Sequence, residues 1–461
     1  MAMVAQRLVT LCATLGEFPH VRFAADGGGR AEGVARTFQA RMEEFVSNTP
    51  QWNFRGQDTL SRSGDGGRAT LLLVDRCEDT LSPLMHDFTY QCLVQDVLDV
   101  QDDRISYMVE TGKGLSKKDV LLNDQDDLWA EFRHEHIGKV LNDLGNRFRE
   151  LVKNSSGAAS LVKGGGREMS LEAMATATRD LPAFQELSKK MSQHIKIAQQ
   201  CMSKVDKLNL LKIGALEQTM ALGKDELGTS RSHQDLLGGW TMDGERQPGL
   251  LEIMRSSSAT PEMKMRLAGV FTQTQRNLTV TEKRNILGAA SLPPSLVKAL
   301  ENLDVLGFGA RGSQQGRGGS APKKRRFKFG FGTSKSTEEE SDYTHMRPVA
   351  PPFFSYHTPL KTTIDKLATD ELSLEEFPSL LPMPATQKRS EPRSIRKAGK
   401  GGPHISGAYG GARVMVFVIG GVCYSELRGA YECMHTHGRE VIVGGTGFLS
   451  PNDYVQGLRG L

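Results

Sequence analysis

Three residues with acid–base or metal-binding potential lie close together in the first quarter of the chain. Asp75 ends the apolar run Leu71-Leu72-Leu73-Val74, and Asp79 and His86 follow it. Carboxylates and an imidazole at the carboxyl end of a strand can bind a metal, because α/β sheets place their chemistry at that edge. Alternatively, both aspartates cap turns and helix starts while His86 forms a local hydrogen bond. We favour capping, because a metal hydrolase needs more ligands than this run supplies.

Two further candidates lie near the carboxyl end of the chain. Gly420-Gly421 is similar to a phosphate-binding turn, but no G-x-G-x-x-G pattern or P-loop lysine accompanies it, so we predict a tight strand-to-helix turn. Cys423 lies near a helix start, which can lower the pKa of a thiol, although the sequence around it shows no histidine or other base to pair with it. The six cysteines have no zinc-like spacing, which predicts reduced cytosolic thiols and no bound metal or cofactor.

Length and charge exclude several classes of protein. A chain of 461 residues is too long for one hydrophobic core, so we expect two or three folding units. The net charge of +4 gives no global field that would attract nucleic acid. No apolar run is long enough to cross a bilayer, and the amphipathic first residues predict neither a signal peptide nor an anchor.

Strand patterns of one type occur at both ends of the chain. The run Leu71–Val74 is matched by Val414–Ile419 and Val441–Val443, with a helix pattern between the last two. We therefore predict an α/β fold with a mainly helical insertion. In it, a parallel sheet domain is built from residues 1–110 and 405–461 and is interrupted by a helical domain at 111–404.

The insertion has the most regular apolar spacing in the chain. Steps of three and four residues predict two long helices within 137–205, joined by a polar, glycine-rich tip at 154–167, and thus a helical hairpin. Further helices are expected at 248–256, 261–273, 279–289 and 293–303. Composition predicts disordered or loop-like tracts at 307–337 and 381–411.

A cluster of basic residues lies inside the first of these tracts. It consists of Lys323, Lys324, Arg325, Arg326 and Lys328. Such clusters occur in nuclear-import or RNA-binding segments, but we interpret this one primarily as a solvated loop. If it binds anything, anionic lipid headgroups are the better match, because they attract each basic residue near the surface by about 1 kcal/mol.

Four blocks of sequence resemble the SM (Sec/Munc, syntaxin-binding) family, in the order and spacing of that family. In chain order, the four blocks are LLLVDRCEDTLSPLMHDFTYQCLVQDVL, LLNDQDDLWAEFRHEHIGKV, VMVFVIGGVCYSELRGAY and EVIVGGTGFLSPNDYVQGL. The second block looks closest to the exocytic branch. The chain begins inside what would be the family's second domain, so we expect it to lack the first domain. That domain supplies a wall of the cleft for closed syntaxin and the pocket for the syntaxin N-terminal peptide, so neither binding mode carries over.

The resemblance implies a function in vesicle docking and membrane fusion during exocytosis. The chain would bind syntaxin-type and vesicle SNARE helices and template their assembly, without catalysis or a cofactor. It would be monomeric and cytoplasmic, peripherally associated with the plasma membrane or secretory vesicles. The alternative function is a metal-dependent α/β hydrolase that uses Asp75 and Asp79.

The resemblance also points to the distal hairpin as the SNARE-binding element. The candidate contact residues are Pro182, Phe184, Gln185, Leu187, Met191 and Ile195. Asp180 is placed as an N-cap with Pro182 in the first turn, so we expect a helix to start there. Proline inside a helix costs about 3 kcal/mol, so we expect 170–180 not to continue into that helix and Pro182 to act as a switch.

Overall fold

A computed structural model describes residues 1–25, 28–55, 67–111, 114–163, 171–275, 278–312, 356–382 and 411–461. The two ends of the chain form one parallel sheet, as the sequence predicts. Its strands are β1 (His20–Phe23), β2 (Thr70–Asp75), β8 (Val414–Ile419) and β10 (Val441–Gly445), in the order β1-β2-β8-β10. Every neighbouring pair is parallel.

Successive side chains of the central strands enter two different cores. Leu71 and Leu73 point toward α1 (Ala2–Leu15) and α2 (Arg30–Asn48), whereas Leu72 and Val74 point toward α13 (Pro359–Ala368) and α14 (Tyr424–His437). Alternation is inherent to a strand, so a sheet covered on both faces needs apolar residues at every position. This requirement explains the unbroken apolar run of β2.

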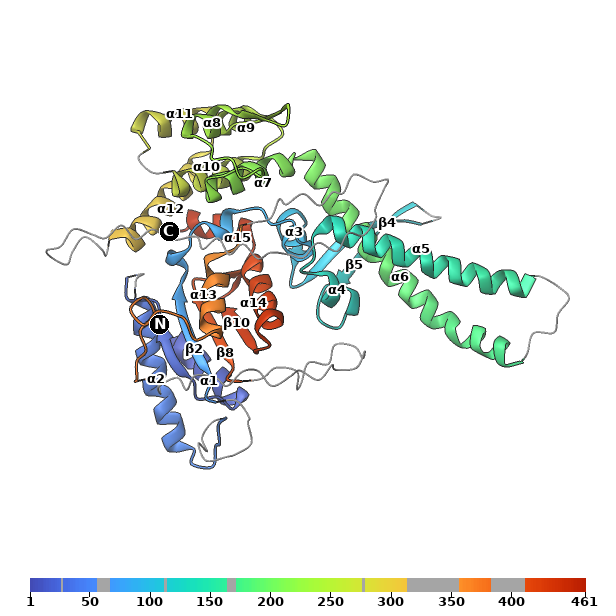
Figure 1. The fold of residues 1–461 in the computed structure, drawn as a ribbon, viewed down its shortest axis with the longest axis horizontal. Coiled ribbons are helices and arrows are strands. Elements are labelled where there is room, and N and C mark those ends of the chain that lie inside the picture. The colour runs from blue at the N-terminus through green and yellow to red at the C-terminus, as the bar shows by residue number, and fades with distance from the viewer. Residues whose placement is uncertain are drawn as a thin grey trace.

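The rest of the described chain is mainly helical (Figure 1). Its long helices are α5 (Ile137–Lys163), α6 (Leu171–Lys207), α7 (Leu210–Leu222), α10 (Pro261–Thr274), α11 (Val280–Ala290) and α12 (Pro294–Gly312). Shorter elements are η1 (Arg76–Glu78), η2 (Ser82–Leu84), α3 (Tyr90–Val97), α4 (Asp127–Phe132), α8 (His233–Gly238), α9 (Leu250–Arg255) and α15 (Pro451–Arg459).

Three small sheets complete the described elements. The first is antiparallel and contains β3 (Val100–Gln101), β4 (Arg104–Thr111) and β5 (Gly114–Leu121). The others pair β6 (Trp240–Met242) with β7 (Glu245–Gln247), and β9 (Val422–Cys423) with β11 (Phe448–Leu449).

The four helices predicted between residues 248 and 303 are confirmed as α9 to α12. One of them is longer than expected, because α12 continues to Gly312 into the tract that composition marked as loop-like. Residues 313–355 and 383–410, which hold the rest of the two predicted loops, lie outside the described residues.

The exact domain boundaries stay a prediction, and two elements pack across them. Helix α13 lies within 111–404 but buries Leu360 and Ile364 against the sheet. Helix α15 lies within 405–461 but buries Tyr454 and Val455 in the core of the helical part. Sequence order alone does not reveal such exchanges, because an amphipathic stripe does not identify its partner.

A buried ion pair joins the two sequence-distant halves of the sheet domain. The Arg76 guanidinium donates to both Glu426 carboxylate oxygens, at 2.7 and 2.9 Å, and to the Asp79 carbonyl at 2.9 Å. Glu426 is 1% exposed, and its carboxylate also accepts from the backbone N–H of Cys423 at the start of α14. The pair therefore fastens the end of β2 to the first turn of α14.

A second contact joins α14 to the connection between α4 and α5. The His134 ring lies 4.5 Å from the Tyr431 ring, and Arg133 lies over the same ring and donates to its hydroxyl at 2.8 Å. Burial, together with the Arg133 and Arg428 charges, lowers the pKa of His134 to about 3. His134 is therefore neutral in the folded protein near pH 7.

We expect Glu426→Gln to destabilise the protein by about 3 kcal/mol, because it leaves the buried Arg76 charge with only the Asp79 carboxylate, 3.3 Å away, as its counterion. Glu432, which is 39% exposed beside Arg428, provides a matched control. Glu432→Gln should lower the free energy of unfolding by less than about 1 kcal/mol. Urea denaturation measures both values, and equal values for the two variants would contradict the assigned role of Glu426.

We expect stability to fall as the pH drops below about 6.5, because the unfolded chain then protonates His134 while the folded chain does not. His134→Phe retains a ring against Tyr431 but cannot titrate. Between pH 7 and pH 5 the parent should lose about 2 kcal/mol more than this variant. Thermal unfolding across this range tests the expectation, and parallel pH profiles would refute it.

Candidate functional site

The acidic residues at the end of β2 are occupied by structural contacts. Asp75 is 3% exposed and pairs with Arg30 at 2.7 and 3.0 Å. It also accepts from the backbone N–H of Cys77 at 2.9 Å. Asp79 accepts from the N–H groups of Leu81 and Ser82, each at 3.0 Å. The capping interpretation is confirmed for both aspartates.

His86 has a more distant partner than the sequence suggested. Its ring Nδ1 lies 2.8 Å from the Glu217 carboxylate on α7, and its backbone N–H donates to the same carboxylate at 2.8 Å. The expectation of a local hydrogen bond is therefore wrong, because the tertiary fold brings α7 against this segment. Within the described ranges, no group of three or more His, Cys, Asp or Glu side chains is arranged to hold a metal ion.

The glycine pair after β8 forms the predicted tight turn. Gly420 and Gly421 have φ angles of +97° and +102°. An added Cβ would lie 2.8 Å from Arg76 at the first glycine and 2.7 Å from Leu449 at the second. Cys423, just beyond the turn, is 5% exposed. Burial and the nearby Glu426 raise its pKa well above the usual value, so the expectation of an activated thiol is wrong.

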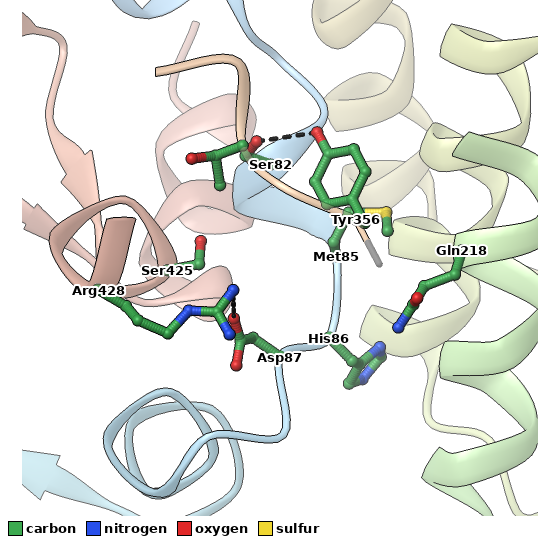
Figure 2. Close-up of a pocket in the computed structure, with 9 residues that line it drawn as sticks. Ser82, Met85, His86, Asp87, Gln218, Tyr356, Ser425 and Arg428 are labelled. Carbon is green, nitrogen blue, oxygen red and sulfur yellow. Dashed lines mark hydrogen bonds and ion pairs between the residues drawn. The ribbon is translucent and has the colours of Figure 1, made fainter. Parts of the chain in front are cut away.

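A small cavity lies where α14, α7, the segment after β2 and the segment before α13 meet (Figure 2). Its volume is about 20 Å³. Substrate and cofactor pockets are typically more than tenfold larger, so an organic substrate would not fit. This cavity gives no support to the hydrolase alternative.

The predicted helical hairpin is present and projects from the body of the protein (Figure 1). Helices α5 and α6 lie side by side, and their tip at 164–170 lies outside the described residues. At the base of the hairpin, Leu144 of α5 and Ile197 and Ala198 of α6 are fully buried in the helical core. The described base is thus anchored by the apolar seams that the sequence showed.

The predicted helix start at Pro182 is wrong. Helix α6 runs without interruption from Leu171 to Lys207, so Asp180 is not an N-cap and 171–180 continues into the same helix. A proline inside a helix removes one backbone hydrogen bond and usually kinks the helix without necessarily ending it. The side chains of Pro182 and Phe184 lie outside the part of the chain that the structure describes.

The remaining candidate residues on α6 divide into surface and core positions. Gln185 is exposed, and Leu187 is 38% exposed. Met191 is 5% exposed and belongs to the core, and Ile195 is half-buried against the same core. Met191 and Ile195 therefore support the hairpin, whereas Gln185 and Leu187 face solvent.

The outer face of α6 continues as a polar, basic stripe toward the body. Lys189, Lys196, Lys204 and Lys207 are exposed along it. The sequence predicts an apolar stripe along α6, and in the described part of the helix most of that stripe packs inward. The spacing of residues did not show which face of α6 is buried, because residues on either face of a helix recur at the same intervals of three and four.

Sequence reasoning missed a polar cluster that fixes the base of the hairpin. His194 on α6 is fully buried, with Nε2 3.0 Å from Asp126 and Nδ1 3.0 Å from the Tyr90 hydroxyl. Burial alone would raise the pKa of Asp126, but His194 and the N–H groups of Leu128 and Trp129 lower it. The sequence signal was Asp126 in the position of an N-cap before an apolar pair.

The basic cluster at Lys323–Lys328 lies outside the described residues. Elsewhere in the described chain, no helix combines the length and the apolar character needed to cross a bilayer.

Known sequences and structures resemble almost the entire chain. A protein of Dictyostelium discoideum named protein transport protein sec1 is 28% identical over 468 residues, covering 99% of this chain and 71% of the relative. SNARE-interacting protein KEULE of Arabidopsis thaliana is 23% identical over 497 residues, covering 99% of this chain and 70% of the relative.

Two solved structures share the fold. The Unc18–syntaxin 1 complex from Monosiga brevicollis matches with a TM-score of 0.68 and 23% identity, over 99% of this chain and 70% of the solved chain. The SM protein Vps45 in complex with the Qa SNARE Tlg2 matches with a TM-score of 0.65 and 19% identity, over 100% of this chain and 70% of the solved chain. A model of the Sec1 family matches residues 1–457, and this chain therefore belongs to the Sec1 family, the SM proteins.

Proposed function

We propose that this chain is a SNARE-binding regulator of vesicle docking and membrane fusion in exocytosis. It binds syntaxin-type and vesicle SNARE helices and templates their parallel assembly. The observation that carries the proposal is the projecting α5–α6 hairpin, whose inner face is anchored in the core and whose outer face is free for a partner. A helix on such a face is recognised through side chains at helical spacing.

The exposed positions of α6 supply both kinds of contact that SNARE helices need. Leu187 offers an exposed apolar side chain one turn before Met191, on the inner side of the helix, whereas Gln185 and the lysines from Lys189 to Lys207 offer polar and positively charged groups on the outer side. Apolar contacts favour association, and complementary charges set its register and rate. Pro182 and Phe184 remain part of the proposed surface, farther toward the tip.

The exocytic assignment rests on the likeness to proteins whose names refer to Sec1 and to SNARE interaction. We propose that the chain acts as a cytoplasmic monomer, peripherally associated with the plasma membrane or secretory vesicles, with no cofactor and no enzymatic activity. The hydrolase alternative has no supporting observation, because Asp75 and Asp79 are engaged by Arg30 and by backbone N–H groups.

Leu187→Asp should weaken vesicle-SNARE binding at least about tenfold, since it places a charge within an apolar contact. Leu211→Asp on α7 is the matched control, because Leu211 is 40% exposed and Leu187 is 38% exposed. Titration of each folded variant with the SNARE helix measures the effect. Ile195→Asp is a weaker test, because Ile195 also packs on the core. Unchanged affinity in Leu187→Asp would remove this residue from the binding surface.

Pro182→Ala cannot lengthen α6 at its start, because the helix already begins at Leu171. The expectation that Pro182 separates residues 170–180 from this helix and acts as a switch is therefore wrong. The proposed role of Pro182 is now limited to its place on the surface.

Charge reversal of the basic cluster Lys323–Lys328 should reduce association with anionic vesicles and leave SNARE binding intact. The reason is that each basic residue near an anionic surface contributes about 1 kcal/mol at low salt, and this attraction is screened as salt rises. Vesicle co-sedimentation measures the change, with neutral vesicles as the control. If the parent and the reversed variant sediment equally at low salt, the cluster is only a solvated loop.

A further inference from the structure

A straight row of lysines runs along the outer side of α6. Lys189, Lys196 and Lys207 are all exposed. They are separated by seven and eleven residues, close to two and three whole helical turns, so the three side chains lie within about 20° of one another around the helix axis. The row extends over about 27 Å of a helix that projects from the body of the protein (Figure 1).

The three lysines of the row form no ion pair with any residue that the structure describes. By contrast, the neighbouring Lys190 pairs with Glu186, whose carboxylate lies 3.4 Å from the lysine Nζ. An ion pair of that kind needs an acid four residues away along the helix. The residues four positions before those of the row are Gln185, Ser192 and Ser203. The positive charge of the row is therefore not neutralised within the helix.

The row and the exposed apolar side chain of α6 lie on opposite sides of the helix. Between Gln185 and Lys207, Leu187 is the exposed large apolar residue, with 38% of its surface accessible. It lies about 160° around the helix axis from Lys189 and about 180° from Lys196. One straight helix that packs along α6 cannot contact both sides. The row and Leu187 therefore belong to two separate surfaces.

The geometry of the row fits an acidic helix better than a membrane surface. A helix that lies along α6 has the same rise of about 1.5 Å per residue, so acids at intervals of seven and eleven residues would meet all three lysines. A helix that binds a bilayer usually presents large apolar side chains beside its lysines. The residues beside the row are instead polar and uncharged, namely Gln193, Gln200 and Ser203.

Two sides of α6 can thus serve two different helices. The proposed function assigns a vesicle SNARE helix to the side of Leu187. We propose that the lysine row binds the syntaxin-type SNARE helix, through acidic residues spaced seven and eleven apart on the polar side of that helix. Because the contact uses charged side chains, the apolar side of the bound helix stays free to pack against other SNARE helices. This inference rests on the proposed function and specifies its second partner.

The test is a titration of the full chain with a purified syntaxin-type SNARE helix at low salt. The row variant combines Lys189→Gln, Lys196→Gln and Lys207→Gln, which removes the three charges. Such exposed substitutions usually change stability little, so the variant should fold. We expect it to bind about tenfold more weakly, because three exposed ion pairs are lost. The difference should vanish near 1 M salt, where the screening length is about 3 Å.

Two controls separate the row from net charge and from side-chain packing. Lys117→Gln, Lys118→Gln and Lys298→Gln combined remove the same charge from exposed positions outside α6, and this variant should bind like the parent. Arginine at all three positions of the row keeps the charge and should also retain binding. An equal loss of affinity in the row variant and in the first control would overturn the inference, because net charge alone would then explain it.

The remaining outcomes distinguish the inference from the proposed function. If the parent and the row variant bind the syntaxin-type helix equally at low salt, the inference is overturned and the proposed function stands. If the parent binds neither this helix nor the vesicle SNARE helix, the proposed function fails and the inference fails with it. Sedimentation with anionic vesicles that is lost in the row variant, while its SNARE binding is unchanged, would identify the row as a membrane contact and would also overturn the inference.

Discussion

The Arg76 guanidinium must be neutralised inside the protein, and the way this is achieved determines much of the architecture. Arg76 follows the central strand β2, and its counterion Glu426 comes from the first turn of α14, at the opposite end of the chain. A buried charge without its partner is far costlier than the net contribution of the pair. The two ends of the chain are therefore held together, and β2 and β8 align in register beneath the pair.

A second set of buried polar contacts holds the helical part together and against the segment that follows β2. His86 reaches Glu217 on α7, Arg266 of α10 pairs with Asp96 at 2.6 Å, and His194 connects α6 to Asp126. Each contact joins segments far apart in sequence and is buried, so each fixes an orientation rather than merely adding stability. The hairpin projects in a defined direction because its base is held in this way.

The sequence alone predicted the parallel sheet, the helical insertion, the hairpin and the caps at Asp75 and Asp79, because these follow from local periodicity and capping. It did not predict which apolar stripe is buried, so Met191 was taken for a contact residue. It also placed a helix boundary at Pro182, whereas α6 is continuous from Leu171 to Lys207. Partners such as Glu217 for His86 depend on tertiary packing and have no local signal.

The central claim is that a Sec1-family sheet domain presents the α5–α6 hairpin to SNARE helices. Amide hydrogen exchange of the full chain, with and without a purified syntaxin-type or vesicle SNARE helix, tests it most directly. The account predicts binding, with slowed exchange concentrated in α6 between Gln185 and Lys207 and little change in β2 or β8. Absence of binding, or protection confined to the sheet domain, would contradict the account.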